Sequence, residues 1–500
     1  MRDCPDIQPD QGISVDTKGW DTVSAIRIDT LNAAIADAGT SPPGFDEPAE
    51  GAMVSARFRP WMISPESDGR LLTMKLPLHD ITITKPDGAR CFDRGHAMID
   101  VHLDLLPHEA SDNGQVTTCL LVVDLEPQGG DDTAARLTDL RIEGHHSIED
   151  AAYLRLALGT WLNANLDAFT HVFATVNIHK AVTDQEDFKW LKPSRVGYAF
   201  GYDQKDPEQS IMAVLCRTDG RAEAGLPYQV APEALPEGLT VSYLISRQLF
   251  MKDMLKGAVV RSFDGLESSD LTFAFDDTVM RTTRHVPLKD VEYEGKTYDM
   301  TLETFELTLR ETDFRVETNA ASKVFPGIWS VSHTEAAYGI RMITGRAGQK
   351  TLGFIETEEM LAQKTQRVAA GVNVLEWMLI IIFAICIIIL NAATFGTGSI
   401  IPTVLAGLLI GCGIGSLTIE IIEAVNDGDG PAIDMLVLNA TEAIAWSTGS
   451  KFVPTEAGLR GAMSIAGTFE TGKTANAEAP ARLFQKRFAA TMAARRRKAA

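Results

Sequence analysis

Residues that could bind phosphate stand near the C-terminus, where Gly467, Gly472, Lys473 and Thr474 match the nucleotide-binding pattern GxxxxGK[ST]. In such a loop the backbone amides and the lysine hold the phosphates, and a later strand supplies an Asp for magnesium. Only 26 residues follow Thr474, and one of them is Pro480, so the remaining βα units of a nucleotide-binding fold do not fit. We therefore interpret the match as a turn after the last strand.

Two further polar clusters contain residue types that can bind a metal ion. His145 and His146 stand beside Glu143 and Glu149 just before a predicted helix, and a polar loop at the helix start is the simpler interpretation. The sequence DGDG at 427–430 lacks the third acidic position and the terminal glutamate of a calcium loop, and predicts a tight acidic turn. The motifs HExxH and GxSxG and the Rossmann glycine fingerprint do not occur. We therefore predict a protein that is not an enzyme and has no metal site.

An uncharged run dominates the last third of the chain. Residues 377–419 are 43 residues without Asp, Glu, Lys, Arg or His. The run contains most of two apolar blocks, 374–390 and 400–422, each close to the ~20 residues that a helix needs to cross a bilayer. We expect an apolar helical hairpin at 372–424. Exposing such a surface to water costs roughly 25 cal/mol per Å², so lipid, the protein's own interior or an oligomer interface must cover it.

Membrane insertion is the preferred interpretation of this hairpin. Gly407, Gly411 and Gly415 recur every four residues, a spacing that lets two helices approach closely in lipid. Burial in the protein interior is the alternative, although each glycine would weaken a soluble helix by roughly 1 kcal/mol relative to Ala. The residues predicted to contact lipid or membrane are Trp377, Ile382, Phe383, Ile388, Leu405, Gly407, Leu409, Gly411 and Gly415.

Charge is divided unevenly between the body of the chain and its end. The formal net charge is −21, and residues 478–500 carry seven Lys or Arg against one Glu, a net +6, which leaves −27 on residues 1–477. Nucleic acid requires a basic protein surface, so this acidic body argues against it as a partner.

The basic tail has an amphipathic pattern. Phe484, Phe488 and Met492 recur every four residues among the basic residues, which is typical of a helix that binds an anionic lipid surface. A solubilising tail and a clamp on the acidic body are the alternatives. The residues predicted to bind an anionic surface are Arg482, Lys486, Arg487, Arg495, Arg496, Arg497 and Lys498.

The first residues and the cysteines bear on the cellular compartment. The opening MRDCPDIQPDQG has acidic residues and prolines where a signal peptide needs an apolar core. The six cysteines are scattered without a CxxC pair, as expected for free thiols. We expect synthesis in the cytoplasm, followed by membrane association or export by a route without a cleaved signal.

The pattern of apolar residues indicates the elements that would position these features. Alternation of apolar and polar residues predicts strands at 71–84, 97–106 and 302–309. A long helix capped by Ser147 follows the first series of strands, and another helix is predicted near 242–255. Strands in runs, rather than in strict βαβ alternation, predict an α+β fold with antiparallel sheets.

Several landmarks along the chain carry a resemblance to a known family. They include GWDTV at 19–23, FTHVFATVN at 169–177, WLKP at 190–193, LIS at 244–246, and Trp446 near the end. In this order they resemble the OrfX-type and forty-seven-kilodalton proteins of clostridial toxin gene clusters, a branch of the tubular lipid-binding (TULIP) superfamily. The resemblance spans residues 19 to about 467, almost the whole chain.

The resemblance implies an α+β fold in which long helices are wrapped by strongly curved antiparallel sheets, to which this chain adds its apolar helical hairpin. It also implies that a phospholipid or fatty acyl ligand binds in an apolar groove, and that other toxin-cluster proteins are partners. The expected organisation is an N-terminal tail (1–18), a first module (19–205), a connecting segment with a helix (206–265), a second module with the hairpin (266–475) and a basic amphipathic tail (476–500).

The expected function is non-enzymatic lipid binding, with a helical hairpin that engages or enters the membrane. The alternative is a structural or secretion-linked component of a multiprotein toxin complex. In that case a partner, a second copy of the chain or the protein's own interior would cover the hairpin.

Overall fold

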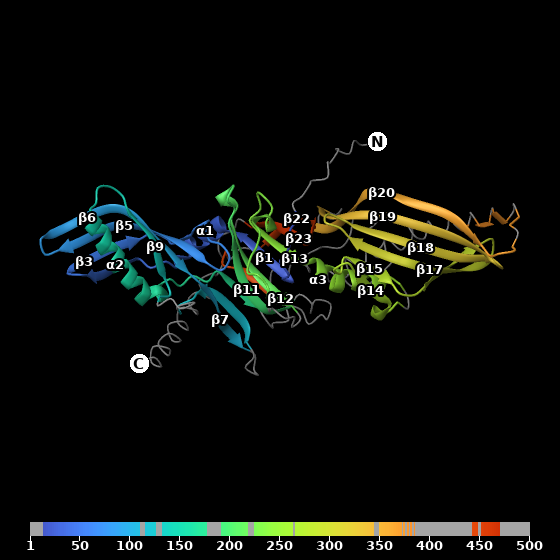
Figure 1. Ribbon diagram of the computed structural model, residues 1–500, viewed down its shortest axis with the longest axis horizontal. Coiled ribbons are helices and arrows are strands. Elements are labelled where there is room, and N and C mark those ends of the chain that lie inside the picture. Colours follow the sequence, from blue (N-terminus) through green and yellow to red (C-terminus); the bar gives the residue numbers. More distant parts are fainter. Residues whose placement is uncertain are drawn as a thin grey trace.

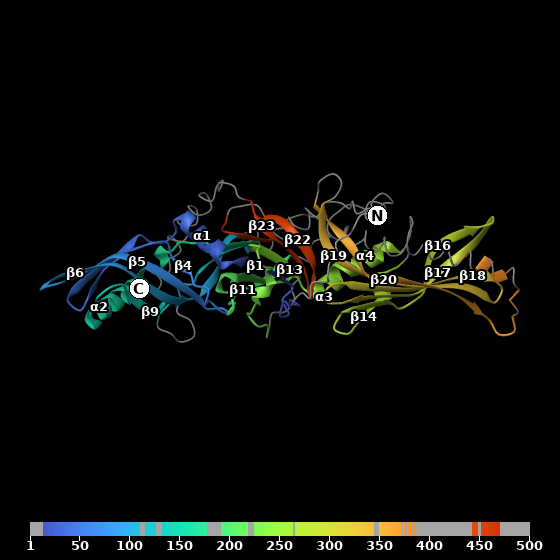
Figure 2. The same ribbon diagram turned by 90° about the horizontal axis from the view of Figure 1, so that it is seen from above.

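The protein is an elongated rod of antiparallel sheets, with one β-rich module at each end and two further sheets between them (Figure 1). The same long profile is seen after a quarter turn (Figure 2). The computed structural model describes residues 14–110, 116–126, 133–177, 192–218, 225–263, 266–344, 350–372, 374–375, 378–379, 381–382, 385, 443–448 and 452–470.

The first module is built on long strands that bury every second residue. In β5 (Leu72–Lys85) the side chains of Leu72, Met74, Leu76 and Leu78 are buried, as the alternation predicts. The sheet has the order β2-β3-β5-β6-β9, and β4 pairs with β5. Its other strands are β2 (Gly44–Ala49), β3 (Ala52–Phe58), β4 (Met62–Ile63), β6 (Gly88–Val101) and β9 (Arg136–Ile142).

Two sheets occupy the middle of the rod. The larger one has the order β11-β12-β1-β13-β23-β22, and so joins strands from both halves of the chain. Its strands are β1 (Thr22–Arg27), β11 (Pro193–Gly201), β12 (Ile211–Thr218), β13 (Val241–Ile245), β22 (Phe452–Arg460) and β23 (Ala462–Phe469). The smaller sheet has the order β21-β10-β8-β7, formed by β7 (Leu103–Ala110), β8 (Val116–Val123), β10 (Ala174–Asn177) and β21 (Ile444–Trp446).

The second module is a seven-stranded antiparallel sheet with the order β14-β15-β17-β18-β19-β20, and β16 pairs with β17. Its longest strands have 17 and 19 residues and run along the rod (Figure 1). The strands are β14 (Leu271–Ala274), β15 (Val279–Thr282), β16 (Val286–Tyr293), β17 (Lys296–Leu309), β18 (Phe314–Phe325), β19 (Ile328–Thr344) and β20 (Lys350–Val368).

Helices are few and cover the sheets locally. Ser147 caps α2 (Ile148–Asn165) in a capping box with Asp150, as the sequence predicts for this helix start. The segment predicted near 242–255 begins instead as strand β13 and continues as a helical stretch of three pieces. These pieces are α3 (Arg247–Leu249), the π-helical η5 (Phe250–Leu255) and α4 (Lys256–Ser262), and the other helices are α1 (Ile28–Ala38), η1 (Leu166–Ala168), η3 (Pro207–Gln209), η4 (Pro232–Ala234) and η6 (Ser268–Asp270).

The expectation of long helices wrapped by sheets is wrong. In the described part of the chain, strands form most of the ordered structure, and the longest helix is α2 with 18 residues. The apolar helical hairpin expected at 372–424 is also absent from the residues that the structure describes. The physical reason is that long strands with one buried face supply most of the apolar surface, so short helices suffice to cover it.

The structure also places the polar motifs. Gly467, the first glycine of the phosphate-loop pattern, lies inside β23, paired with Val241 and Pro454, so the start of the pattern is strand rather than loop. Lys473 lies outside the described residues. His145 and His146 are exposed in the loop before α2, which confirms the interpretation of a polar helix start.

Candidate functional site

The sheet of the second module has two chemically different faces. On the face that we call the outer face, ion pairs link neighbouring strands. Nε of Arg281 lies 2.6 Å from Oε2 of Glu306, and Nη2 of Arg315 lies 2.6 Å from Oε2 of Glu335. Because side chains alternate along a strand, the intervening residues form the opposite, inner face.

The middle of the inner face carries five hydroxyl side chains, which we call the hydroxyl patch. Its members are Thr318 and Ser322 on β18, and Ser330, Ser332 and Thr334 on β19. Ser322 lies opposite Ser330, and Thr318 lies opposite Thr334. All five residues are at most 2% exposed, so the patch is a buried surface.

Three hydroxyls of the patch lack a hydrogen-bond partner within the described ranges. They are Oγ of Ser322, Oγ of Ser332 and Oγ1 of Thr334, and none has a partner among the residues that the structure describes. A buried polar group without a partner costs roughly 1–3 kcal/mol, and buried polar side chains are normally hydrogen-bonded. Polar atoms of a bound molecule would remove this cost, which makes the patch a candidate site.

Apolar side chains flank the hydroxyl patch at both ends. At the end nearer to α4, Phe263 packs edge-on against Phe305, with ring centroids 5.8 Å apart. At the other end is a cluster that we call the far cluster. Its buried members are Tyr298, Met300, Ala320, Val324, Ile328, Ile382 and Ile385. The inner face is thus apolar at both ends and carries hydroxyl groups in the middle.

The structure describes one of the residues predicted to contact lipid. Ile382 is fully buried in the far cluster, and its carbonyl oxygen accepts a hydrogen bond of 3.1 Å from Oγ of Ser330. Among the described residues, no helix is both long and apolar enough to span a bilayer. The other predicted residues lie outside the described part of the chain: Trp377, Phe383, Ile388, Leu405, Gly407, Leu409, Gly411, Gly415, Arg482, Lys486, Arg487, Arg495, Arg496, Arg497 and Lys498.

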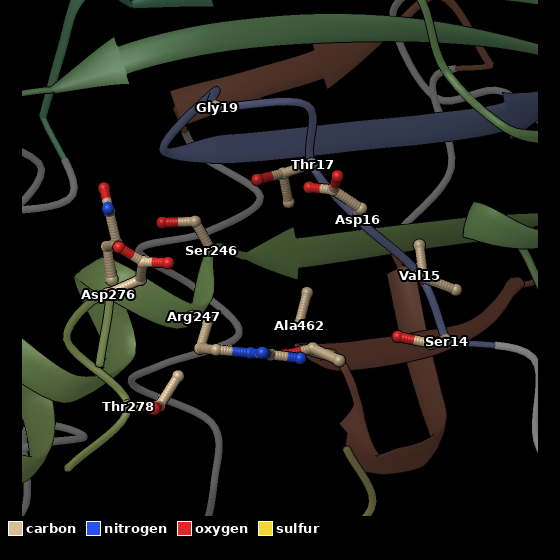
Figure 3. A pocket seen from close by; sticks show the side chains of 12 residues that line it. Ser14, Val15, Asp16, Thr17, Gly19, Ser246, Arg247, Asp276, Thr278 and Ala462 are labelled. Carbon is tan, nitrogen blue, oxygen red and sulfur yellow. The ribbon is translucent and has the colours of Figure 1, made fainter. Parts of the chain in front are cut away.

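A polar cavity of about 440 Å³ lies where the central sheet meets the second module. Figure 3 shows the Arg247 side chain extending toward Ala462, with Asp16 and Asp276 on separate sides of the pocket. Nε of Arg247 donates a hydrogen bond of 3.3 Å to the carbonyl oxygen of Gly461. Two carboxylates and one guanidinium do not select between an anion and a cation, so the inner face is the stronger candidate site.

One wall of this pocket is a turn with an unusual backbone. Phe275, Asp276 and Asp277 have φ angles of 51°, 53° and 65°, in the left-handed region that residues other than glycine rarely adopt. Oδ2 of Asp277 forms an ion pair of 2.8 Å with Nζ of Lys252, which holds the turn against the helical stretch. Phe275 is 72% exposed.

The sequence analysis missed the hydroxyl patch, although a signal for it exists. Thr318, Ala320 and Ser322 occupy every second position of β18, and in the next strand Ser330, Ser332 and Thr334 alternate with larger residues. Small residues at every second position of two successive strands, five of the six with a hydroxyl, predict a shared face. In the residues that the structure describes, no group of His, Cys, Asp or Glu side chains is arranged to hold a metal ion.

Comparison with known proteins defines the class. The family model OrfX-like, described as Protein OrfX2/OrfX3/P47, matches residues 17–467, and the chain belongs to this family. It is 25% identical to Protein OrfX3 of Paraclostridium bifermentans over 490 residues, which cover 90% of this chain and 98% of that protein. It is also 25% identical to Protein OrfX3 of Clostridium botulinum (strain Kyoto / Type A2) over 496 residues, which cover 92% of this chain and 99% of that protein.

Solved structures agree on the fold. P47 from Clostridium botulinum A2 has a TM-score of 0.63 and 13% sequence identity, and the match covers 91% of this chain and 98% of P47. P47 of Clostridium botulinum E1 has a TM-score of 0.61 and 13% sequence identity, and the match covers 90% of this chain and 99% of that P47. At this identity the likeness concerns the fold alone.

Proposed function

We propose that the protein is a non-enzymatic lipid-binding protein that holds an acyl chain on the inner face of its second sheet. The observation that carries this proposal is the hydroxyl patch, where three buried hydroxyl groups, which have no partner in the described part of the chain, lie between two apolar ends. A molecule that suits such a face has long apolar chains and a few hydrogen-bonding atoms. Glycerolipids have this composition, with ester carbonyls between their acyl chains and their headgroups.

The contacts at the far cluster support the same ligand class. Ile382 and Ile385 pack there against Met300 and Val324, so this part of the face accepts aliphatic chains. Ser330 donates its hydroxyl to the Ile382 carbonyl, the kind of acceptor that an ester also offers. Ser332 and Thr334 follow on the same strand and face with hydroxyls that could act in the same way.

Family membership is consistent with the proposal, because the resemblance implies an apolar groove and a setting among toxin-cluster proteins. We extend the proposal to the membrane as the source of the lipid.

The test is lipid binding by the full-length protein. Organic extraction and mass spectrometry should detect glycerolipid, and a fluorescent acyl probe should bind and be displaced by phosphatidylcholine.

The double variant Ser332→Ala/Thr334→Val removes two hydroxyls that have no partner among the described residues. Since a hydrogen bond contributes about 0.5–1.5 kcal/mol, we expect phosphatidylcholine to bind roughly tenfold more weakly to this variant. The stability of the lipid-free variant should be equal to or higher than that of the lipid-free parent.

The matched control is Ser242→Ala. Oγ of Ser242 is also buried, but it donates to the carbonyl oxygen of Ala234 at 2.7 Å, so its removal should lower stability by roughly 1–3 kcal/mol. Lipid affinity should not change in this control. Absence of extracted lipid together with absence of probe binding would refute the proposal and favour the structural component of a complex.

A further inference from the structure

The polar cavity between the central sheet and the second module holds two opposite charges that do not pair with each other. Nε of Arg247 donates to the carbonyl oxygen of Gly461 at 3.3 Å, and the two terminal nitrogens of the guanidinium have no partner within the described ranges. The carboxylate of Asp276 also forms no ion pair with any residue that the structure describes. The cavity therefore presents a cation and an anion that the protein itself leaves without a counter-charge.

The two charges belong to different elements of the cavity wall (Figure 3). Arg247 is the first residue of the helical stretch that follows β13, and Asp276 lies in the β14–β15 turn. The third charged residue of the lining, Asp16, already forms an ion pair of 3.6 Å with Nζ of Lys18. The cavity volume of about 440 Å³ falls within the range of small-molecule sites, so a ligand can lie between Arg247 and Asp276.

The backbone of the β14–β15 turn supports a role for Asp276. Three successive residues of this turn have left-handed angles although none is glycine, which would adopt them without strain. Strained residues of this kind cluster at ligand sites. Asp277 forms the ion pair with Lys252, whereas the carboxylate of Asp276 is free to meet a ligand. A glycine at position 276 would relieve the strain but would remove this carboxylate.

We propose that this cavity binds a small zwitterion, a molecule with an anionic group and an ammonium group a few bonds apart. Arg247 donates to the carboxylate or phosphate of the ligand, and Asp276 accepts from its ammonium group. An ion with a single charge neutralises one of these two residues and meets a like charge at the other, whereas a zwitterion neutralises both. Free amino acids and the phosphoethanolamine group of lipids share this chemistry.

The zwitterion site is separate from the inner face of the second module. The helical stretch from Arg247 to Ser262 consists of pieces of three, six and seven residues, which corresponds to roughly 24 Å at about 1.5 Å per residue. The inner face begins at the far end of this stretch, where Phe263 packs against Phe305. Zwitterion binding can therefore be measured independently of lipid binding.

Isothermal titration calorimetry on the full-length protein tests the proposal with γ-aminobutyrate, glycine and phosphoethanolamine. At least one of these zwitterions should bind about tenfold more tightly than butyrate and butylamine, each of which carries only one of the two charges. Binding of γ-aminobutyrate or glycine assigns a free amino acid, and binding of phosphoethanolamine alone assigns a lipid headgroup. If no zwitterion binds, or if butyrate or butylamine binds equally well, the proposal is overturned.

Two neutral variants test the location of the site. Arg247→Gln and Asp276→Asn should each weaken zwitterion binding about tenfold, because each removes one charge-assisted contact. Asparagine tolerates the left-handed backbone at position 276, so this variant keeps the turn. Arg155→Gln, which removes an exposed arginine of α2, is the matched control and should not change the affinity.

The zwitterion site and the lipid site can fail separately. Ser332→Ala/Thr334→Val should bind the zwitterion as tightly as the parent does, and Asp276→Asn should keep the parent affinity for phosphatidylcholine. If Arg247→Gln does not fold, Asp276→Asn decides alone. Zwitterion binding that is unchanged in Asp276→Asn overturns the proposal.

Discussion

The two end modules solve the same packing problem differently. In the first module the sheet is closed by its own helix, since Trp161 of α2 packs against Phe45 and Phe58, with ring centroids 5.9 and 5.5 Å away. In the second module the helical stretch ends at Ser262, near Phe305, and hydroxyls farther along the inner face have no partner among the described residues. The comparison teaches that one sheet is closed by the aromatic side chains of its own helix, whereas the inner face of the other carries buried hydroxyls that have no partner among the described residues.

Charge follows the same division. In the first module the carboxylate of Asp150 is fully buried and lies 2.6 Å from Nη1 of Arg90. Burial alone would raise the pKa of Asp150, but hydrogen bonds from Ser147 and the guanidinium of Arg90 together hold it below its ordinary value. The helix start is thus fixed through Oδ2 of Asp150, which pairs with Ser147 and Arg90, whereas Oδ1 of Asp150 has no hydrogen-bond partner among the described residues.

The largest expected effect comes from breaking the closure of the first module. Trp161 is 9% exposed, and Trp161→Ala should lower the free energy of unfolding by roughly 3–5 kcal/mol, since it leaves a cavity among aromatic rings. Leu156→Ala on the same helix removes a side chain that is 43% exposed. This variant should change the free energy of unfolding by less than about 0.5 kcal/mol. Chemical denaturation measures both, and equal effects would contradict the comparison.

A smaller effect concerns His171, which is 3% exposed and lies within hydrogen-bond distance of Oγ1 of Thr40 and Oγ of Ser447. Burial lowers its pKa from 6.5 to about 3, so on acidification the unfolded chain binds the proton first. Stability is therefore lost from about pH 6.5 down to pH 3.

On going from pH 7 to pH 5, the free energy of unfolding of the parent should fall by roughly 2 kcal/mol more than that of His171→Gln. Denaturant unfolding at the two pH values measures it. His146→Gln, which replaces an exposed histidine, is the control and should keep the full pH dependence. A parent and a His171→Gln variant with the same pH dependence would show that His171 is protonated without unfolding.

The smallest expected effect concerns the backbone conformation of one turn in each end module. The β5–β6 turn of the first module has Gly88 at φ 146°, whereas the β14–β15 turn of the second module has three successive residues other than glycine with left-handed angles. Asp276→Gly should raise the free energy of unfolding by about 1 kcal/mol, because glycine adopts this conformation without strain.

Asp37→Gly in the exposed face of α1 should instead lower the free energy of unfolding by about 0.5–1 kcal/mol. The opposite signs separate relief of strain from a general effect of glycine. A decrease at both positions would show that the turn is not strained.

Much of the local structure could be predicted from the sequence. The start of α2 follows from Ser147, and the buried positions of β5 follow from alternation, because both signals lie within a few residues. The proportions of helix and strand could not be predicted in the same way. The stretch at 242–255 has helical and strand character together, and pairing with β1 and β23 made its first part the strand β13.

The candidate site shows the same limit. The sequence directed attention to the uncharged run, but the apolar hairpin predicted there is absent from the residues that the structure describes. The structure directed attention to Ser322, Ser332 and Thr334, which are unremarkable as single residues. Their significance comes from cross-strand pairing and burial, which no local pattern reports.

By itself the sequence determined the family landmarks, the strand alternation, the acidic body and the basic tail, because each is a property of residue type and spacing. Only the tertiary structure decided which face of each strand is closed. That outcome depends on contacts between residues far apart in the chain, such as β18 with β19 and Phe263 with Phe305. Burial removes water from every polar atom on an inner face, so the tertiary structure alone reveals which hydroxyls are left without a partner.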